Sequence, residues 1–149
     1  MAGKIILLVE DNLHDEALTM RALRKHGIAN EVIVARDGAE ALDILFATGS
    51  HEGRPLAEMP EVVLLDLNLP KIGGFEVLKR LRADDRTRLL PIVILTSSGE
   101  ERDLTEGYAS GANSFVSKPV EFAEFSQAIQ RLGMYWLLVN KAAPLPTAT

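Results

Sequence analysis

The chain has 149 residues, 47% of them hydrophobic and 25% charged, which is the ordinary composition of one globular domain. Its net charge of −5 argues against a nucleic-acid-binding surface, and the basic cluster Lys79-Arg80-Leu81-Arg82 is predicted to form the solvated face of a helix. The absence of cysteine excludes disulfides and thiolate chemistry, and no apolar run is long enough to span a bilayer. We therefore expect a cytoplasmic protein that binds neither DNA nor a membrane.

The N-terminal stretch predicts a strand followed by a helix. Residues 5–9 are apolar throughout, as in parallel strands that are buried on both faces. They lead into Glu10 and Asp11, and then into Asn12, a favourable helix N-cap. Over residues 13–26, apolar residues recur at helical spacing. We expect the buried side of this helix to consist of Leu13, Ala17, Met20 and Leu23.

The alternation of strand and helix continues through the middle of the chain. A strand is predicted over residues 31–35, and Asp37 and Gly38 open a helix that runs to Phe46. Residues 48–61 then show no periodicity. Connections in such domains usually take about 2–6 residues, so we expect this long one to protrude.

The next strand ends in an acidic residue. Val62 to Leu65 are consecutive apolar residues, and Asp66 follows at the point where the chain leaves the sheet. A loop over residues 67–74 leads into a helix. Its apolar residues are Phe75, Val77, Leu78 and Leu81.

Two further strands end in polar residues. A strand over residues 91–95 ends at Thr96, and a short one over residues 114–117 ends at Lys118. A helix is expected between them, over residues 100–110.

We expect the chain to form one domain. A last helix is predicted to begin near Glu121 and to continue to Val139. The domain would cover residues 1–140, with this helix extended. Residues 141–149 are rich in Pro and Ala and are expected to be a disordered tail.

Strands that alternate with helices form a parallel sheet covered on both faces. Every strand of a parallel sheet ends at the same edge, where ligands bind in open α/β proteins. This edge would gather residues that are far apart in the sequence, namely Glu10, Asp11, Asp66, Thr96 and Lys118.

Glu10, Asp11 and Asp66 would place three carboxylates at this edge. Each pair about 4 Å apart costs on the order of 4 kcal/mol at an effective dielectric near 20, so the group favours a bound cation. Oxygen ligands without histidine or cysteine are typical of Mg²⁺. The backbone carbonyl of Asn68 would add a neutral ligand.

A metal beside a carboxylate, a lysine and a hydroxyl suits phosphoryl transfer, in which positioning and charge neutralisation matter most. Asp66 would be the nucleophile and would form an aspartyl phosphate. Lys118 would pair with one phosphate oxygen, and Thr96 would donate its hydroxyl to another.

Four short motifs resemble those of the receiver domain of two-component response regulators, in the same order along the chain. They are Val9-Glu10-Asp11-Asn12, Leu65-Asp66-Leu67-Asn68-Leu69-Pro70 with Gly73-Gly74, Leu95-Thr96-Ser97 and Ser117-Lys118-Pro119. The resemblance covers about residues 4 to 132. It implies an α/β, flavodoxin-like (βα)5 three-layer sandwich with a five-stranded parallel sheet in the order 2-1-3-4-5.

The resemblance also implies how the site works. Asp66 would accept a phosphoryl group from a sensor histidine kinase, Asp11 would bind Mg²⁺ directly, and Glu10 would help through water. The Lys118-Pro119 peptide would be cis. Such a protein catalyses its own phosphorylation and slow dephosphorylation, and is otherwise not an enzyme.

A conformational switch is implied in the same way. Thr96 would move toward the phosphate, and Phe115 would turn inward into the space left. Phosphorylation adds about −1.5 to −2 charges, and the surface that responds would be formed by the fourth helix, fifth strand and fifth helix.

Two features resemble the single-domain regulators that pair with bacterial and cyanobacterial phytochromes: the loop over residues 48–61 and the helix extension around Tyr135-Trp136. A segment as apolar as residues 132–139 must be covered. Either it folds back on its own sheet or it meets a second copy, and we favour a symmetric homodimer through the last helix. Since no output domain is expected after residue 132, the protein would be a phosphorelay intermediate, a regulator of another protein or a phosphate sink.

Two other families combine a related sheet with phosphate chemistry. A phosphatase of the haloacid dehalogenase type also uses Asp, Thr, Lys and Mg²⁺, but it needs an Asp two residues after the nucleophile, where this chain has Asn68. A flavodoxin-like carrier of FMN would need a phosphate-binding loop after the first strand, where Glu10 and Asp11 would repel a phosphate.

Overall fold

The computed structural model describes the larger part of the chain. The residues it describes are 5–25, 31–49, 52–53, 59–67, 69, 71–96, 108–109, 111–112, 114–117 and 127, and for residues 96 and 114–117 it describes the backbone alone. Up to β4, strands and helices alternate as predicted. They are β1 (Ile5–Val9), α1 (Leu13–Lys25), β2 (Glu31–Ala35), α2 (Gly38–Phe46), β3 (Val62–Asp66), α3 (Gly74–Arg82), β4 (Ile92–Thr96) and β5 (Ser114–Ser117).

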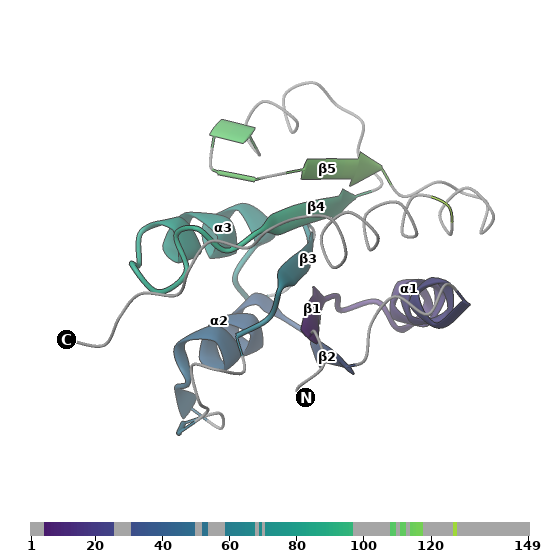
Figure 1. Cartoon of the computed structure of the whole chain (residues 1–149), viewed down its shortest axis with the longest axis horizontal. Helices are drawn as coiled ribbons and strands as arrows, with labels where there is room; N and C mark the ends of the chain where they lie inside the picture. Colours follow the sequence, from purple (N-terminus) through teal and green to yellow (C-terminus); the bar gives the residue numbers. More distant parts are fainter. Residues whose placement is uncertain are drawn as a thin grey trace.

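The strands form one parallel sheet in the order β2-β1-β3-β4-β5, which confirms the predicted topology (Figure 1). β3 lies at the centre of the sheet and all of its residues are buried. β2 lies at the edge, and most of its residues are only partly buried. The uninterrupted apolar runs of β1 and β3 therefore belong to strands that are covered on both faces.

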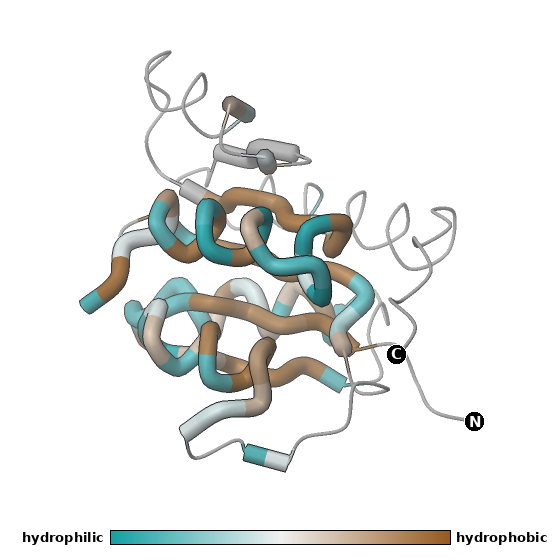
Figure 2. The backbone as a smooth tube through the Cα atoms, turned by 90° about the vertical axis from the view of Figure 1, so that its left-hand side faces the viewer, coloured by the Kyte–Doolittle hydropathy of each residue, from teal (hydrophilic) through white to brown (hydrophobic). Residues whose placement is uncertain are grey.

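Helices cover both faces of the sheet, with α1 on one face and α2 and α3 on the other (Figure 1). Alternate side chains of each strand point to opposite faces, which divides the core into two layers. Leu7, Val9, Val63, Leu65, Ile92 and Ile94 join the layer under α2 and α3, whereas Ile6, Leu8, Val62, Leu64, Val93 and Leu95 join the layer under α1. Figure 2 shows apolar strands enclosed by helices of mixed polarity.

The buried side of α1 differs from the predicted one. Leu13, predicted to be buried, is 68% exposed, and Ala17 is exposed as well. Thr19 and Ala22 are buried instead. The hydroxyl of Thr19 donates to the carbonyl of Asp15 at 2.9 Å, and this bond allows a polar side chain to lie in the core.

Parts of the predicted fold lie outside the described residues. These are most of the loop over residues 48–61, nearly all of the helices predicted over residues 100–110 and from Glu121 onward, and the tail over residues 141–149. None of the helices that the structure describes is long and apolar enough to cross a membrane.

The turn from β3 into α3 requires a glycine. The N–H of Gly74 donates to the carbonyl of Leu67 at 3.1 Å. A Cβ atom on Gly74 would lie 2.5 Å from the carbonyl oxygen of Asp66 and 2.8 Å from the Cα of Leu67, and both are backbone atoms that cannot move cheaply. A Cβ atom on Gly73 would meet no atom within 4 Å. The backbone of α3 thus packs directly against the end of β3.

Arg82 is a structural residue, so the prediction of a solvated basic face is wrong at this position. Its Nε donates to the carbonyl of Gly111 at 2.8 Å, and its Nη1 to those of Thr87, Arg88 and Leu90 at 3.1, 3.0 and 2.7 Å. Burial lowers the pKa of the guanidinium, because a charge is costly where water is scarce. The carbonyl oxygens offset this cost, and they join the end of α3 to the segments before β4 and β5.

We expect Gly74→Ala to lower the free energy of unfolding by about 1–3 kcal/mol, because the added methyl group overpacks against the backbone of β3. The measurement is urea denaturation of the two alanine variants beside the wild type. Gly73→Ala is the comparison variant and should cost less, at most about 1 kcal/mol, because its methyl group meets no atom and only the N-cap residue of α3 changes. Equal stability of the two variants would contradict the close approach at Gly74.

We expect Arg82→Lys to lower the free energy of unfolding by about 1.5–3 kcal/mol, since an ammonium group cannot reproduce the fork of donors that the carbonyls bind. Urea denaturation measures this loss. Arg80→Lys serves as the control: Arg80 is half exposed and pairs with Glu76 at 3.2 Å, so its replacement should cost less than about 1 kcal/mol. Wild-type stability of Arg82→Lys would show that the carbonyl contacts contribute nothing.

Candidate functional site

Glu10 and Asp66 come together because β1 and β3 are neighbouring strands in register. Val9 pairs with Leu65, so the next residues, Glu10 and Asp66, lie side by side where the strands end. Glu10 is 1% exposed and Asp66 is 6% exposed. Since Val9 and Leu65 point toward α2 and α3, the alternation of side chains turns both acidic residues toward α1.

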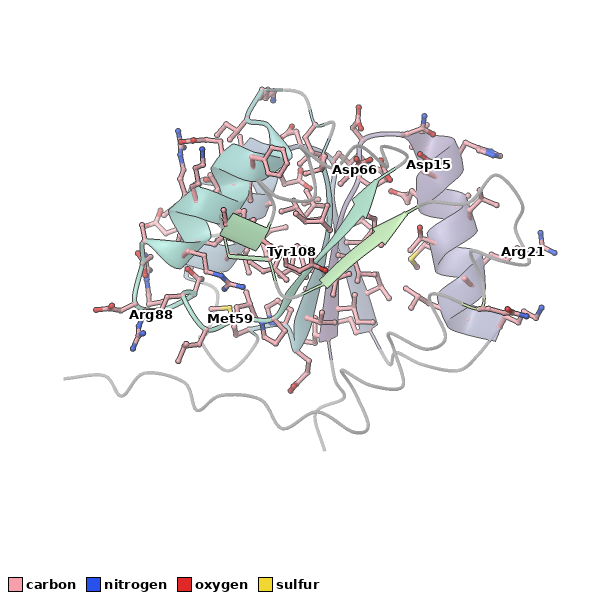
Figure 3. All side chains as sticks on the ribbon, turned by 90° about the horizontal axis from the view of Figure 1, so that it is seen from above. Asp15, Arg21, Met59, Asp66, Arg88 and Tyr108 are labelled. Carbon is pink, nitrogen blue, oxygen red and sulfur yellow. The ribbon has the colours of Figure 1, made fainter. Side chains whose placement is uncertain are left out.

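The first turn of α1 brings a third carboxylate to the same place. The side chain of Asn12 caps the helix by accepting the N–H of Asp15 at 3.0 Å, which confirms the predicted N-cap. One carboxylate oxygen from each of Glu10, Asp15 and Asp66 lies within 4.8 Å of the other two. Figure 3 shows Asp15 and Asp66 side by side at this edge. We call these three residues the acidic group.

Asp11 lies next to the acidic group in sequence but is not part of it. Its side chain is exposed, whereas the carboxylate of Glu10 turns back and accepts the N–H of Asn12 at 3.3 Å. The sequence reasoning missed Asp15 because it considered only residues at strand ends. The signal was present in the sequence, since Asp15 lies in the first turn of a helix predicted to begin at the same edge.

Thr96 continues this edge on the other side of Asp66. Asp66 pairs with Leu95 in β4, so Thr96 lies one residue beyond it, and Thr96 itself pairs with Ser117 in β5. Lys118 follows Ser117 directly but lies outside the described residues. The backbone thus places the end of β4 beside the end of β3, and the end of β5 beside that of β4.

Other predicted features of the site lie beyond what the structure describes. Asn68 and the Lys118-Pro119 peptide are outside the described residues. Phe115 pairs with Ile94 through the backbone of β5, and its side chain is outside the description. The roles of these residues stay predictions.

Two contacts brace the loop between β3 and α3 against α2. The Nζ atom of Lys71 lies 3.3 Å from the carboxylate of Asp37. Asp37 caps α2 by accepting the N–H of Glu40 at 2.7 Å, and this bond, reinforced by Lys71, lowers the pKa of the Asp37 carboxyl. Gly38 packs so closely on Ile72 that any side chain on Gly38 would collide with the Ile72 carbonyl. The loop that leaves the acidic group is therefore held by neighbouring backbone.

The acidic group concentrates negative charge where little water is present. Two unit charges at the 4.8 Å limit of the group repel by about 3–4 kcal/mol at an effective dielectric near 20. Carboxylate oxygens are the ligands that hard divalent cations prefer. The geometry therefore suits a bound cation beside Asp66, whose carboxylate can act as the nucleophile of a phosphoryl transfer.

Comparison with known proteins identifies the family. The profile of the response regulator receiver domain matches residues 6–130. The response regulator Rcp1 from Synechocystis sp. is 34% identical over 145 residues, which cover 97% of this chain and 95% of Rcp1.

Solved structures agree with this match. The Mn²⁺-bound form of Rcp1 has a TM-score of 0.85 and 33% identity, covering 95% of this chain and 99% of Rcp1. The phosphorylated cyanobacterial phytochrome response regulator RcpA has a TM-score of 0.86 and 34% identity, covering 98% of this chain and 100% of RcpA. The bacteriophytochrome response regulator AtBRR is 55% identical with a TM-score of 0.76, covering 95% of this chain and 100% of AtBRR.

These matches extend over most of the chain and favour the receiver interpretation over the phosphatase and the FMN carrier. The sheet order and the buried acidic residues at the strand ends fit the same family. The chain belongs to the response regulator receiver domain family and is a phosphoacceptor signalling protein of two-component systems.

Proposed function

We propose that Asp66 is the residue that accepts the phosphoryl group from a sensor histidine kinase. The observation that carries this proposal is the position of its carboxylate, which lies beside that of Glu10 at the end of the central strand and is 6% exposed. The similarity to RcpA, whose structure is that of the phosphorylated protein, supports it.

In the proposed reaction a carboxylate oxygen of Asp66 attacks the phosphorus atom of a phosphohistidine on the kinase. The new O–P bond forms as the N–P bond breaks, and the electron pair of that bond returns to the imidazole, which leaves as a neutral ring because its other nitrogen carries a proton. Asp66 becomes an acyl phosphate. Attack by water later releases inorganic phosphate and restores the carboxylate.

We assign Mg²⁺ as the cofactor, with Asp11, Asp66 and the carbonyl of Asn68 as its proposed direct ligands and Glu10 as a proposed ligand through water. The similarity to the Mn²⁺-bound form of Rcp1 supports a divalent cation, and a donor set made only of oxygen suits Mg²⁺. When bound, Mg²⁺ would neutralise charge on the phosphoryl group during transfer.

Other residues near this edge of the sheet have proposed roles in binding the phosphoryl group and in the conformational change. Lys118 pairs with a phosphate oxygen, and the hydroxyl of Thr96 moves to another. Phe115 then turns inward, and the surface of the fourth helix, β5 and the fifth helix changes. The register of Thr96, one residue beyond the partner of Asp66 in β4, supports its proposed place beside the phosphoryl group.

The proposed partner is a kinase of the bacteriophytochrome class, which the 55% identity to AtBRR supports.

We propose a cytoplasmic protein with one domain over residues 1–140, a disordered tail over residues 141–149 and a homodimer contact through its last helix. The apolar residues at 132–139 support the dimer.

We expect intact mass spectrometry to detect one added phosphoryl group after incubation with acetyl phosphate and Mg²⁺, and to detect none in Asp66→Asn, because the amide cannot form an acyl phosphate. The adduct should be labile to hydroxylamine and should not form in EDTA. Asp37→Asn is the matched control at the same sheet edge and should be phosphorylated normally. An adduct that persists in Asp66→Asn would place the acceptor elsewhere.

We expect an autophosphorylated bacteriophytochrome kinase to transfer its phosphoryl group to the wild type at least about tenfold faster than a histidine kinase of another class, a difference of about 1.4 kcal/mol in transition-state stabilisation. Transfer of labelled phosphate, followed by gel autoradiography, measures both rates. Asp66→Asn, which should receive no label, controls for non-specific labelling. Equal rates from the two kinases would contradict the partner while leaving Asp66 as the acceptor.

A further inference from the structure

Asp15 has a fixed place beside the phosphoacceptor. Its N–H is held by the side chain of Asn12 at 3.0 Å, and its carbonyl accepts the hydroxyl of buried Thr19 at 2.9 Å. These bonds order the first turn of α1, and the burial of Thr19 seats this part of the helix on the sheet. A carboxylate oxygen of the half-buried Asp15 lies within 4.8 Å of oxygens of Glu10 and Asp66, and Figure 3 shows Asp15 beside Asp66.

Glu16, the next residue along the helix, has a different partner and lies outside the acidic group. Glu16 pairs with Arg36 at the end of β2, with 2.6 Å between the carboxylate oxygen and Nη1. It is not a member of the acidic group. Two neighbouring carboxylates in one turn of α1 therefore have different surroundings, one facing the phosphoacceptor and the other facing a cation.

Resting on the function proposed above, we propose that Asp15 is a further carboxylate of the divalent-cation site and positions the cation through a metal-bound water. Mg²⁺ keeps several of its waters and takes only one or two carboxylates directly. A carboxylate that lies at this distance and is not a direct ligand is suited to accept a hydrogen bond from such a water, and residues that hold metal-bound groups in this way tune affinity strongly. The negative charge of Asp15 also favours a divalent cation beside Asp66.

The same arrangement makes phosphorylation depend on the cation. The phosphoryl group adds about −1.5 to −2 charges at Asp66, and Asp15 is close enough to repel them when no cation is bound. Asp15 thus acts in the unphosphorylated protein by strengthening cation binding, and in the phosphorylated protein by penalising loss of the cation.

The test is binding of Mn²⁺ to the unphosphorylated full chain, followed by electron paramagnetic resonance of free Mn²⁺, with Mg²⁺ competition to obtain the Mg²⁺ Kd. We expect Asp15→Asn to weaken both affinities by about tenfold or more. Glu16→Gln removes one charge from the same turn and should change them by less than about twofold. Asp15→Ala, in which a good helix former replaces the carboxylate, should behave like Asp15→Asn.

The possible results separate this proposal from the function on which it rests. If the wild type binds the cation and both Asp15 variants bind it equally well, the role of Asp15 is overturned and Asp66 remains the acceptor. A Glu16→Gln variant that loses as much affinity as Asp15→Asn would also overturn it, because the effect would then be one of general charge. A wild type that binds no cation would overturn this proposal together with the assigned cofactor, and phosphorylation of Asp66 by acetyl phosphate would still be measured separately.

Discussion

The site depends on the register between β1 and β3. Parallel pairing of Val9 with Leu65 makes the following two residues neighbours and turns both toward α1. Carboxylates so close together repel each other, and their burial strengthens that repulsion. The energy of the packed apolar core therefore offsets the repulsion between these carboxylates. A cation or a charged phosphoryl group that arrives at this edge meets an electrostatic environment that is already in place.

Close backbone packing holds the turns at the ends of the strands in place. Gly74 lets α3 begin directly against the end of β3, and Gly38 does the same for α2 against Ile72. The ion pair of Lys71 with Asp37 links the two turns at the surface. Such a pair, with Lys71 largely exposed, adds little stability. The loop after the phosphoacceptor is accordingly positioned by neighbouring main chain on two sides.

The two ends of the strands have different roles. The edge where the strands end carries the acidic group, whereas the segments that lead into β4 and β5 are held by Arg82. Both places suit a positive charge, but its source differs. At the strand starts it is a guanidinium of the protein that satisfies backbone carbonyls. At the strand ends the carboxylates suit a cation from solution, which can bind and dissociate as the phosphorylation state of the regulator changes.

The sequence by itself determined the strands, their parallel arrangement and the residues at their ends, because apolar runs and the alternation of strands with helices can be read along the chain. It therefore placed Glu10 and Asp66 at one edge, and its motifs indicated the family. Only the tertiary structure decided that Asp15 joins them while Asp11 stays exposed, and that Arg82 is partly buried among carbonyls. These outcomes depend on how each helix is rotated and seated on the sheet, which is set by packing between distant segments and not by the spacing of residues along one of them.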